Sequence, residues 1–573
     1  MKHIKIALLI AALFTHICIS AQLSTNEKPV SFSINLKQPN QSFGITHTVT
    51  TPKLDMKKIE VEDKEDEEFD MPPRFGFAHK VNYDLNNSGI WYELPNGDKL
   101  WQLNVVCPDA LSVNFCYDKF WIPDGGKFFI YTKDKKQSIG AFTSNNNKAT
   151  KENLRGFATG PVYGNDMILE YYQPKEVLTD AIISIDYIVH GYRYISFGEK
   201  DFSRSGNCMV NVNCEEGKNW QHEKNAVALI LVNGNRYCTG SLINTTDLGQ
   251  KPYLLTANHC LGGWANNYIK YDADTLANLD HYSFWWNFEA PGCSNNTTEP
   301  IILSTSGATV IANNSVSDFA LLRLSEDPKY LSNFEPFYLG WDRTGESGDP
   351  GVCIHHPSGD VKKISTIADQ PISTLYLDDT ESLNANHWRV QWSWTPNGYG
   401  TTEGGSSGAA LLTAQHKIIG QLHGGFADCD DNLLEPDRYG KFDISWTGNN
   451  NSTYRRLDCW LDSLNVGVQT LEGLLVIPAS TTMTIDEQLF CNLKILNNAQ
   501  LNIQSNITLS DNSSVIVETG GKLIIDGGIL SNADVILKEG ATLQLINGGI
   551  VETRNGFEAP IGSVVDVGFG QIR

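Results

Sequence analysis

The sequence predicts an all-β protein built from several domains. Short runs of β-branched and aromatic residues recur along most of the chain, and Gly, Pro, Asn and Asp separate them. The 573 residues, 41% of them hydrophobic, are enough for about three or four domains with buried cores. Near the end, GKLIIDGGIL and GATLQLINGGIV are near copies about twenty residues apart, which predicts coils of a parallel β-solenoid.

The first residues have the form of a secretory signal peptide. Two lysines precede an apolar stretch that ends at the small residues Ser20 and Ala21, so residues 1–21 are expected to be removed. The apolar stretch is too short for a membrane-spanning helix, and no other segment is long and apolar enough. We therefore expect an exported protein without a membrane span, secreted or held at the cell surface. Its net charge of −22 argues against nucleic acid and anionic membranes as partners.

Residues 22–200 divide into an acidic linker and a β-rich module. The run IEVEDKEDEEFD, Ile59–Asp70, is typical of a solvated linker. From about Phe75 onward, runs such as LWQLNVV, KFFIYT and MILEYY predict strands. Cys107 and Cys116 are close enough in sequence to staple one hairpin, and an exported chain with twelve cysteines is expected to pair most of them.

Residues 201–468 form a second β-rich region. Strands are predicted in AVALILV, PYLLTA, FALLRL and KIIGQLHG, and YRRLDCWLDSL has apolar residues at helical spacing. Many strands followed by one helix indicate a β-barrel or sandwich closed by a terminal helix. Residues 469–573 hold the solenoid-like repeats. They have no cluster of titratable side chains, so a spacer, adhesive or stabilising role is expected.

Three stretches of the region 201–468 carry the residues of a nucleophilic site. LLTANHC ends an apolar strand with His259, SDFALLRL places Asp318 before another, and GGSSGAALL supplies Ser407. A serine hydroxyl is a weak nucleophile until a base takes its proton, which an imidazole can do near neutral pH. A carboxylate then fixes the imidazole tautomer, and the N–H groups of Gly405 and Ser407 are expected to hold the oxyanion. The order His, Asp, Ser is that of the chymotrypsin-type arrangement.

Each of these three pieces also has a simpler interpretation. A histidine at a strand end is usually structural, an aspartate that opens a strand is usually a turn residue, and Gly-Gly-Ser-Ser-Gly alone is usually a linker. Their combination in this order, in an exported β-rich region with cysteines beside the histidine, favours catalysis.

The region resembles the lysyl endopeptidases, which are secreted bacterial serine proteases of the trypsin-like fold. The resemblance spans nearly all of residues 206–463 and implies a double β-barrel protease domain over 201–468, with residues 22–200 as its propeptide. The N-terminal β-rich module and the C-terminal solenoid lie outside it. The matching stretches are GNCMVNVNCEEG, RYCTGSLINTT, YLLTANHC, SDFALLRL, LGWDR, IHHPSGDVKKIS, TTEGGSSGAALL, GQLHGG and DRYGKFDISWTG.

The resemblance implies where the substrate binds. The family cuts after lysine and has an aspartate where this chain has Asp437, in DRYGK. A carboxylate at the bottom of a narrow pocket can pair with a lysine ammonium, whereas without the resemblance Asp437 would be taken for a solvated turn residue. The stretch QLHGG is expected to pair with the substrate backbone through His423, Gly424 and Gly425, although a structural role for His423 stays open.

The resemblance also implies how most cysteines pair. The partners of Cys353, Cys459 and Cys491 are not set by the sequence, and a pair between Cys353 and Cys459 stays open. The family's three disulfides correspond to Cys208–Cys429, Cys214–Cys293 and Cys238–Cys260.

Two features depart from the related proteases. Ser406 occupies the place where trypsin has the aspartate that receives the new N-terminus, so activation by that salt bridge is not expected. The propeptide is expected instead to mask the cleft or to assist folding. The family's tryptophan before its VQW stretch has no clear counterpart, and Tyr376 is the candidate substitute.

No metal and no cofactor are expected. His355 and His356 in CIHHPSG could suggest a metal site, but no third ligand has convincing spacing. The same stretch occurs in the metal-free protease family, which favours a structural loop.

The sequence therefore predicts a secreted, monomeric serine endopeptidase that cuts after lysine through an acyl-enzyme. Its expected partners are protein or peptide substrates and its own propeptide, and self-cleavage after Lys200 in GEKDFSRSGNC is expected to separate the two. Two alternatives stay open. One is a protease with a broader or an Arg/Lys preference, and the other is a non-catalytic adhesin on a protease scaffold.

Overall fold

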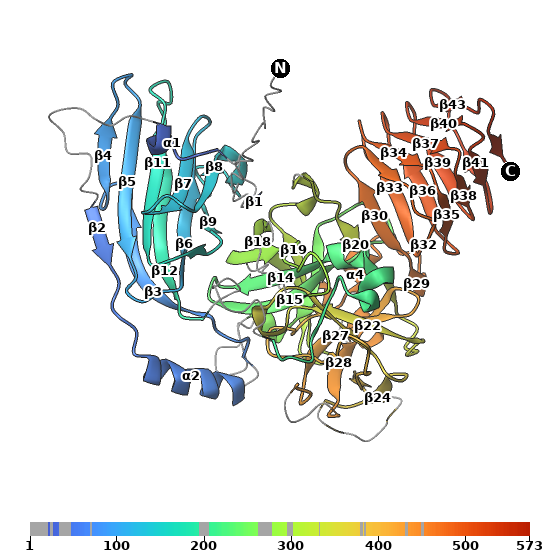
Figure 1. The fold of residues 1–573 in the computed structure, drawn as a ribbon, viewed down its shortest axis with the longest axis horizontal. Coiled ribbons are helices and arrows are strands. Elements are labelled where there is room, and N and C mark those ends of the chain that lie inside the picture. Colours follow the sequence, from blue (N-terminus) through green and yellow to red (C-terminus); the bar gives the residue numbers. More distant parts are fainter. Residues whose placement is uncertain are drawn as a thin grey trace, which may run out of the picture.

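The structure is a computed structural model. The expected signal peptide, apart from Ala21, and the expected cut after Lys200 lie outside the residues that it describes. Three β-rich bodies follow one another along the chain: an N-terminal module, a central region and a C-terminal solenoid (Figure 1). The predicted all-β class is confirmed. The described residues are 21–22, 27–33, 47–68, 71–193, 205–261, 278–294, 302–331, 333–376, 378, 382, 385–429, 434–448 and 452–573.

Two mostly antiparallel sheets form the N-terminal module. Large aromatic side chains, among them Trp101, Phe115 and Phe128, are fully buried in one core shared by both sheets. The first sheet contains β3 (Gly76–Asp84), β6 (Ser112–Trp121), β9 (Arg155–Ala158), β10 (Val162–Tyr163) and β12 (Ile182–Gly191). The second contains β2 (His47–Thr50), β4 (Ile90–Glu93), β5 (Lys99–Val106), β7 (Lys127–Thr132), β8 (Ser138–Phe142) and β11 (Asp166–Gln173).

The acidic run ahead of this module, expected to be a solvated linker, is helical as far as Glu68 and largely exposed. Helix α2 (Met56–Glu68) consists largely of Glu, Asp and Lys. Its carboxylates form ion pairs with Arg74, Arg193 and Arg236. Two of these arginines, Arg193 and Arg236, lie far away in the sequence, so the ion pairs fix the helix against distant parts of the chain.

Six antiparallel strands close into the first barrel of the central region. Their order is β18-β17-β14-β15-β16-β19, and β19 also pairs with β18. All six residues of β14 are buried, because alternate side chains point into the barrel and outward against the N-terminal module. The strands are β14 (Val227–Val232), β15 (Arg236–Leu242), β16 (Tyr253–Ala257), β17 (Asn278–Trp285), β18 (Leu303–Asn314) and β19 (Phe319–Leu324).

The second barrel has the strand order β23-β22-β26-β27-β28-β25. A bridge between Ile367 and Trp392 joins its two ends. Two barrels packed side by side agree with the predicted trypsin-like architecture. The strands are β22 (Pro350–His355), β23 (Lys363–Thr366), β25 (His387–Val390), β26 (Ala410–Thr413), β27 (Lys417–Gly425) and β28 (Asp437–Lys441).

The expected helix at the end of the central region is short. Leu457 and Leu461 are buried, whereas Leu464 is exposed, so only one turn has an apolar face to pack. The described α-helices are α1 (Val30–Ser33), α2, α3 (Phe442–Thr447) and α4 (Asp458–Leu461).

The C-terminal residues form the predicted solenoid. Three parallel sheets run along it, and aligned leucines at positions 501, 523 and 543 stack in register inside the coils. Strand β20 (Phe337–Tyr338) of the central region pairs with the first coil, and both bodies share one hydrophobic core. The sheets contain β30 (Gly473–Ile477), β33 (Cys491–Ile495), β36 (Ser514–Val517), β39 (Asp534–Leu537) and β42 (Phe557–Glu558); β31 (Thr481–Met483), β34 (Gln500–Ile503), β37 (Lys522–Asp526), β40 (Thr542–Ile546) and β43 (Val564–Asp566); and β32 (Glu487–Leu489), β35 (Asn506–Leu509), β38 (Ile529–Ser531), β41 (Ile550–Glu552) and β44 (Gln571–Ile572).

The predicted staple between Cys107 and Cys116 is not formed. Cys107 belongs to the core between the two sheets, whereas Cys116 faces the contact with the first barrel. Cys107 directly follows β5 of the second sheet and Cys116 lies in β6 of the first sheet, so the two cysteines belong to different sheets and different cores. The remaining unpaired cysteines of the described chain are Cys353, Cys459 and Cys491.

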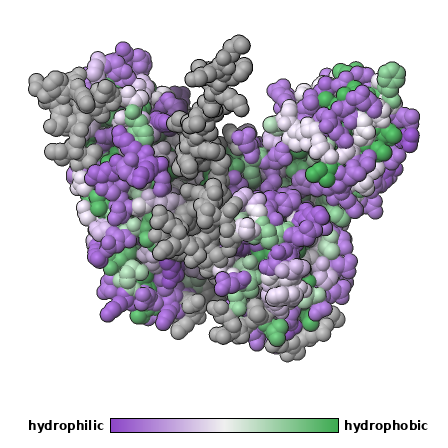
Figure 2. All heavy atoms as spheres, in the orientation of Figure 1, coloured by the Kyte–Doolittle hydropathy of each residue, from purple (hydrophilic) through white to green (hydrophobic). Residues whose placement is uncertain are grey.

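The outer surface is largely hydrophilic. Figure 2 shows polar residues over the visible faces of the N-terminal module and the solenoid, with apolar residues scattered among them. Among the described helices, none has the length and apolar character needed to cross a membrane.

We predict that Leu543→Ala destabilises the solenoid by about 2–5 kcal/mol, because it leaves a cavity in a fully buried stack. Gln544→Ala on the outer face of the same strand is the control and is expected to stay within about 0.5 kcal/mol. Hydrogen exchange of the solenoid amides measures both. Equal protection in the two variants would contradict the assigned direction of these side chains.

Candidate active site

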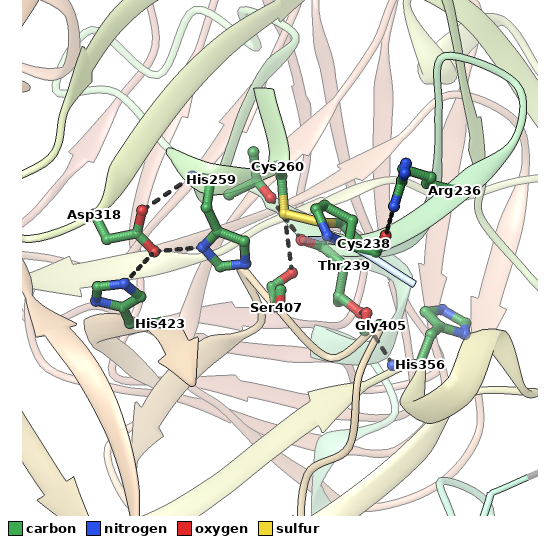
Figure 3. Close-up of a disulfide and its surroundings, with 12 residues drawn as sticks. Arg236, Cys238, Thr239, His259, Cys260, Asp318, His356, Gly405, Ser407 and His423 are labelled. Carbon is green, nitrogen blue, oxygen red and sulfur yellow. Dashed lines mark hydrogen bonds and ion pairs between the residues drawn. A yellow bond between two sulfur atoms is a disulfide. The ribbon is translucent and has the colours of Figure 1, made fainter. Parts of the chain in front are cut away.

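Three loops bring the expected catalytic residues together where the two barrels meet. His259 follows β16, Asp318 directly precedes β19, and Ser407 lies in the turn before β26. His259 and Ser407 line the same cavity, which has a volume of about 1000 Å³. In Figure 3 the imidazole of His259 lies between the carboxylate of Asp318 and Ser407.

The carboxylate of Asp318 holds His259 by two hydrogen bonds. Oδ2 lies 2.7 Å from Nδ1 of the ring, and Oδ1 accepts from the backbone N–H of His259 at 3.0 Å. Burial favours the neutral acid, but the imidazoles of His423 and His259 outweigh it and lower the pKa of Asp318. The carboxylate therefore stays ionised and fixes which ring nitrogen of His259 faces away from it.

Two glycines with positive φ shape the turn that carries Ser407. Gly405 has φ +99° and Gly408 has φ +85°, and a Cβ on Gly408 would lie 2.2 Å from Oγ1 of Thr256. Only glycine fits this close approach between the turn and the first barrel. The turn is therefore held in one conformation by strand β16.

The two adjacent serines have different surroundings. Ser406 is fully buried, and its hydroxyl contacts Nδ1 of His355 at 2.8 Å and accepts from the N–H of Glu403 at 3.2 Å. Ser407 instead lines the cavity beside His259. Ser406, which replaces the aspartate of trypsin, thus packs into the second barrel as a structural residue.

The expected oxyanion donors are available. Within the described residues, the N–H groups of Gly405 and Ser407 have no hydrogen-bond acceptor. Their carbonyl groups are fixed by Thr239, whose hydroxyl donates to Gly405 and whose N–H donates to Ser407, both at 2.9 Å. The donors are therefore held by the first barrel before any ligand binds.

His423 lies against Asp318. Its Nε2 is 3.7 Å from Oδ2 of Asp318, and Figure 3 places it on the side of the carboxylate opposite Ser407. The ring of Tyr376, the expected tryptophan substitute, stacks on His423 with a centroid distance of 3.7 Å and an interplanar angle of 8°. Only 4% of His423 is exposed, and its side chain packs against the carboxylate of Asp318.

Two further residues of this network were not predicted. Nδ1 of His423 lies 2.9 Å from Nε2 of His387, whose Nδ1 contacts the side-chain oxygen of Asn386 at 2.8 Å. The amide of Asn386 then donates to the carbonyl of Val316, in the loop that carries Asp318. Nothing in the stretch NHWRV indicates this role, because the contacts form only when β25 lies beside β28 and β27.

Asp437 lies in the wall of the same cavity. Its Oδ2 accepts from Trp392 Nε1 at 2.7 Å and from the hydroxyl of Thr402 at 2.6 Å. Burial raises the pKa of Asp437 to about 6, although these two donors oppose the shift. Within the described chain Asp437 has no salt bridge, so a cation that enters the cavity would find an unpaired carboxylate.

The two expected glycines lie beside this carboxylate at the end of β27. Gly425 pairs with Asp437 across the sheet, and a Cβ on Gly425 would lie 2.0 Å from its Oδ1. Gly424 also lines the cavity. Small residues at this edge leave room for an extended ligand.

The three expected disulfides are present: Cys208–Cys429, Cys214–Cys293 and Cys238–Cys260. The last joins β15 to the turn that carries His259. Each can stabilise the fold by about 2–4 kcal/mol.

His355, the last residue of β22, and His356, which follows it, are both fully buried. Nε2 of His355 contacts Ser365 at 2.9 Å and its Nδ1 contacts Ser406, whereas Nδ1 of His356 contacts the carbonyl of Asp360 at 2.9 Å. These contacts fit the expected structural loop.

Two groups of described side chains have donor atoms close enough for a metal ion. In the first, Cys238 and Cys260 are joined in a disulfide beside His259 and offer no thiolate. The second consists of His259, Asp318 and His423, in which the carboxylate is already paired with His259.

Residues 202–440 match the family model of the lysyl endopeptidase C-terminal domain. The resemblance to the lysyl endopeptidases is confirmed. The lysyl endopeptidase of Pseudomonas aeruginosa is 29% identical over 241 residues, which cover 40% of this chain and 47% of that protein. The chain thus spans about half the length of that curated relative.

Similar solved structures include a serine endoprotease from Yersinia pestis, with 16% identity and a TM-score of 0.24 over 39% of this chain and 61% of that chain. The HtrA-type protease AlgW with a tripeptide has 17% identity and a TM-score of 0.23 over 39% and 60%. The double barrel is defined by the strand pairing of the two sheets in the central region.

We predict that the buried histidine beside Ser406 contributes to acid lability. Burial, aided by Lys363, lowers the pKa of His355 to about 3, so the folded protein binds no proton here while an unfolded chain does below about pH 6.5. The free energy of unfolding therefore falls as pH drops from 6.5 toward 3, by at most about 1.4 kcal/mol per unit from this residue. His355→Gln is expected to flatten that dependence.

Urea unfolding at pH 7, 5 and 4 measures the effect. His47→Gln, at an exposed position, is the control and is expected to keep the parent dependence. An unchanged pH dependence in His355→Gln would contradict the assignment.

Proposed function

We propose that this chain is a secreted serine endopeptidase that hydrolyses peptide bonds after lysine. One observation carries the proposal: the His259–Asp318 pair opens onto Ser407 in a cavity whose wall also contains the buried, unpaired carboxylate of Asp437. The first three residues supply the chemistry and the fourth supplies the preference for a cation. The match to the lysyl endopeptidase model over 202–440 supports both.

His259 acts first as a base and then as an acid. As Oγ of Ser407 attacks the substrate carbonyl carbon, its proton passes to the ring nitrogen of His259 that faces away from Asp318. The imidazolium is stabilised by the ionised carboxylate and then protonates the leaving amine. Water repeats the sequence on the acyl-enzyme and frees Ser407.

The N–H groups of Gly405 and Ser407 stabilise the charge that develops on the substrate oxygen. Each such donor typically lowers the barrier by about 2.7–4 kcal/mol. Because Thr239 holds both carbonyl groups of this turn, the donors need no rearrangement during the reaction.

The chain order suggests maturation by cleavage. Residues 22–200 serve as the propeptide, 201–468 as the protease domain and 469–573 as an attached solenoid. Three disulfides are typical of an oxidising compartment, which agrees with an N-terminal signal peptide and export. Self-cleavage after Lys200 would separate the propeptide from the catalytic domain.

The direct test maps every cut that the processed protein makes in a denatured substrate protein. We expect nearly all cuts to follow lysine, and Ser407→Ala to abolish them without changing the circular dichroism spectrum. N-terminal sequencing of the same sample is expected to begin near residue 201. Cuts without preference for the preceding residue, or cuts that persist in Ser407→Ala, would rule out the proposal.

We expect Asp437→Asn to lower kcat/KM for lysine substrates at least about 100-fold, because the buried partner of the ammonium is lost. The pKa of Asp437, raised to about 6, adds a signature: lysine binding strengthens as pH rises through about 6 in the parent, and this dependence disappears in the variant. Asp428→Asn, which lines the same cavity but is only half-buried, is the matched control. Equal losses of kcat/KM in the two variants would contradict the assignment of Asp437 to the lysine pocket.

A further inference from the structure

One edge of β15 contacts the turn that carries Ser407. β15 pairs with β14 along its length but with β16 only at its last two residues. On the remaining edge, the N–H of Thr239 donates to the carbonyl of Ser407 at 2.9 Å, and two residues earlier the N–H of Tyr237 donates to the carbonyl of Pro73 at 3.1 Å. A strand rises about 3.3 Å per residue, so Pro73 binds about 7 Å from the site where the backbone of Ser407 is held.

The segment that occupies this edge is residues 71–75, MPPRF, here called the strap. It runs antiparallel to β15: Arg74 bridges Arg236, and the N–H of Phe75 donates to the carbonyl of Asn235 at 2.9 Å. An extended peptide that adds itself to a free sheet edge uses the geometry by which proteins bind peptides. The strap therefore occupies a peptide-binding edge.

The strap also contacts the turn that holds the oxyanion donors. The ring of Pro73 lies so close that a Cβ on Gly404 would come within 2.7 Å of it. Met71 lines the same cavity as His259 and Ser407. The nucleophile turn lies between β15 and β27, because Thr239 of β15 donates to the carbonyl of Ser407 at 2.9 Å and the N–H of Gly408 donates to the carbonyl of Leu422 in β27 at 2.8 Å. Asp437 pairs with the end of β27, so a substrate that runs from the Asp437 pocket across the nucleophile would next meet the strap on β15.

The strap is a poor substrate for the site it occupies. Met71 carries no charge for the Asp437 pocket, and the two prolines that follow have no N–H to donate to a strand edge. It can bind there without being cut.

Ion pairs clamp helix α2 over the same cavity. Asp63 accepts from Nε of Arg74 at 2.8 Å and from Nη2 of Arg193 at 2.7 Å, and Asp66 accepts from Arg236 of β15 at 2.6 Å. The side chain of Asp63 is only 9% exposed, so these arginines offset the cost of burying its carboxylate.

A second anchor joins the N-terminal module to the first barrel. Lys148 of the N-terminal module inserts into the first barrel, where its ammonium donates to the carbonyl of Asp280 at 3.1 Å and to the hydroxyl of Ser306 at 3.3 Å. Next to it, the amide of Asn146 donates to the buried carboxylate of Glu326 at 3.2 Å. This anchor holds the module on the barrel that supplies β15.

We infer that the strap is a built-in inhibitor that blocks the leaving-group half of the cleft until the N-terminal module departs. The inference rests on the proposed function and specifies its regulation: residues 72–75 take the place of the substrate residues after the cut, while the Asp437 pocket stays unfilled. The unprocessed chain can then accept a small lysine ester but not a long peptide.

The test uses the full chain with Lys200→Gln and Arg204→Gln, confirmed intact on a gel. Two substrates are compared: the methyl ester of acetyl-lysine, and a twelve-residue peptide with lysine in the middle. We expect the ratio of peptide to ester hydrolysis to be at least tenfold lower in the intact chain than in the processed chain. Arg74→Ala and Asp63→Ala each remove one partner of the ion pair that joins the strap to α2, and both are expected to raise the ratio in the intact chain at least tenfold. Lys57→Ala, at an exposed position of α2, is expected to leave the ratio unchanged.

Three results would overturn the inference. One is an equal ratio in the intact parent and both loosened variants, and another is loss of ester and peptide hydrolysis together in the intact chain while the processed chain is active. A third is a cut between residues 71 and 72. If the processed chain hydrolyses neither substrate, the proposed function fails, and the inference that rests on it fails too.

Discussion

The buried carboxylate of Asp318 constrains the whole candidate site. A carboxylate with no exposed surface stays ionised only if neighbouring groups offset a desolvation cost of several kcal/mol. His259 does so from one side, and His423 faces the carboxylate from the other. The contacts that continue through His387 and Asn386 return to the loop that carries Asp318. One charge thus fixes residues from both barrels, and the orientation of His259 follows from that arrangement.

Three aspartates of this cleft differ in what surrounds them, and the difference assigns their roles. Asp318 faces two imidazoles and is kept ionised. Asp63 forms ion pairs with Arg74 and Arg193, which hold α2 against the strap. Asp437 has hydrogen-bond donors but no cation among the described residues, and burial raises its pKa. The only carboxylate of the three without a salt-bridge partner in the described chain is therefore the one placed to receive a ligand cation.

Much of this arrangement could be predicted because it depends on short sequence motifs. The strand ending in His259, the Asp318 stretch, the Gly-Ser turn and the paired cysteines are recognisable in short segments, and the solenoid repeats are regular. What could not be predicted depends on contacts across long separations. Helix α2 of the acidic run is held by Arg193 and Arg236, and Cys107 and Cys116 are kept apart because they belong to different sheets and different cores. Lys148 likewise gains its role only when two bodies pack together.

The most direct test of the central claim is a burst experiment with the processed protein and the 4-nitrophenyl ester of acetyl-lysine. The account predicts one equivalent of nitrophenol released per chain before steady turnover. It also predicts that acid quenching traps an acetyl-lysyl group on the peptide that contains Ser407, as read by mass spectrometry. A burst without that adduct, an adduct on a different residue, or turnover that continues after Ser407→Ala would contradict the claim that Ser407 is the nucleophile.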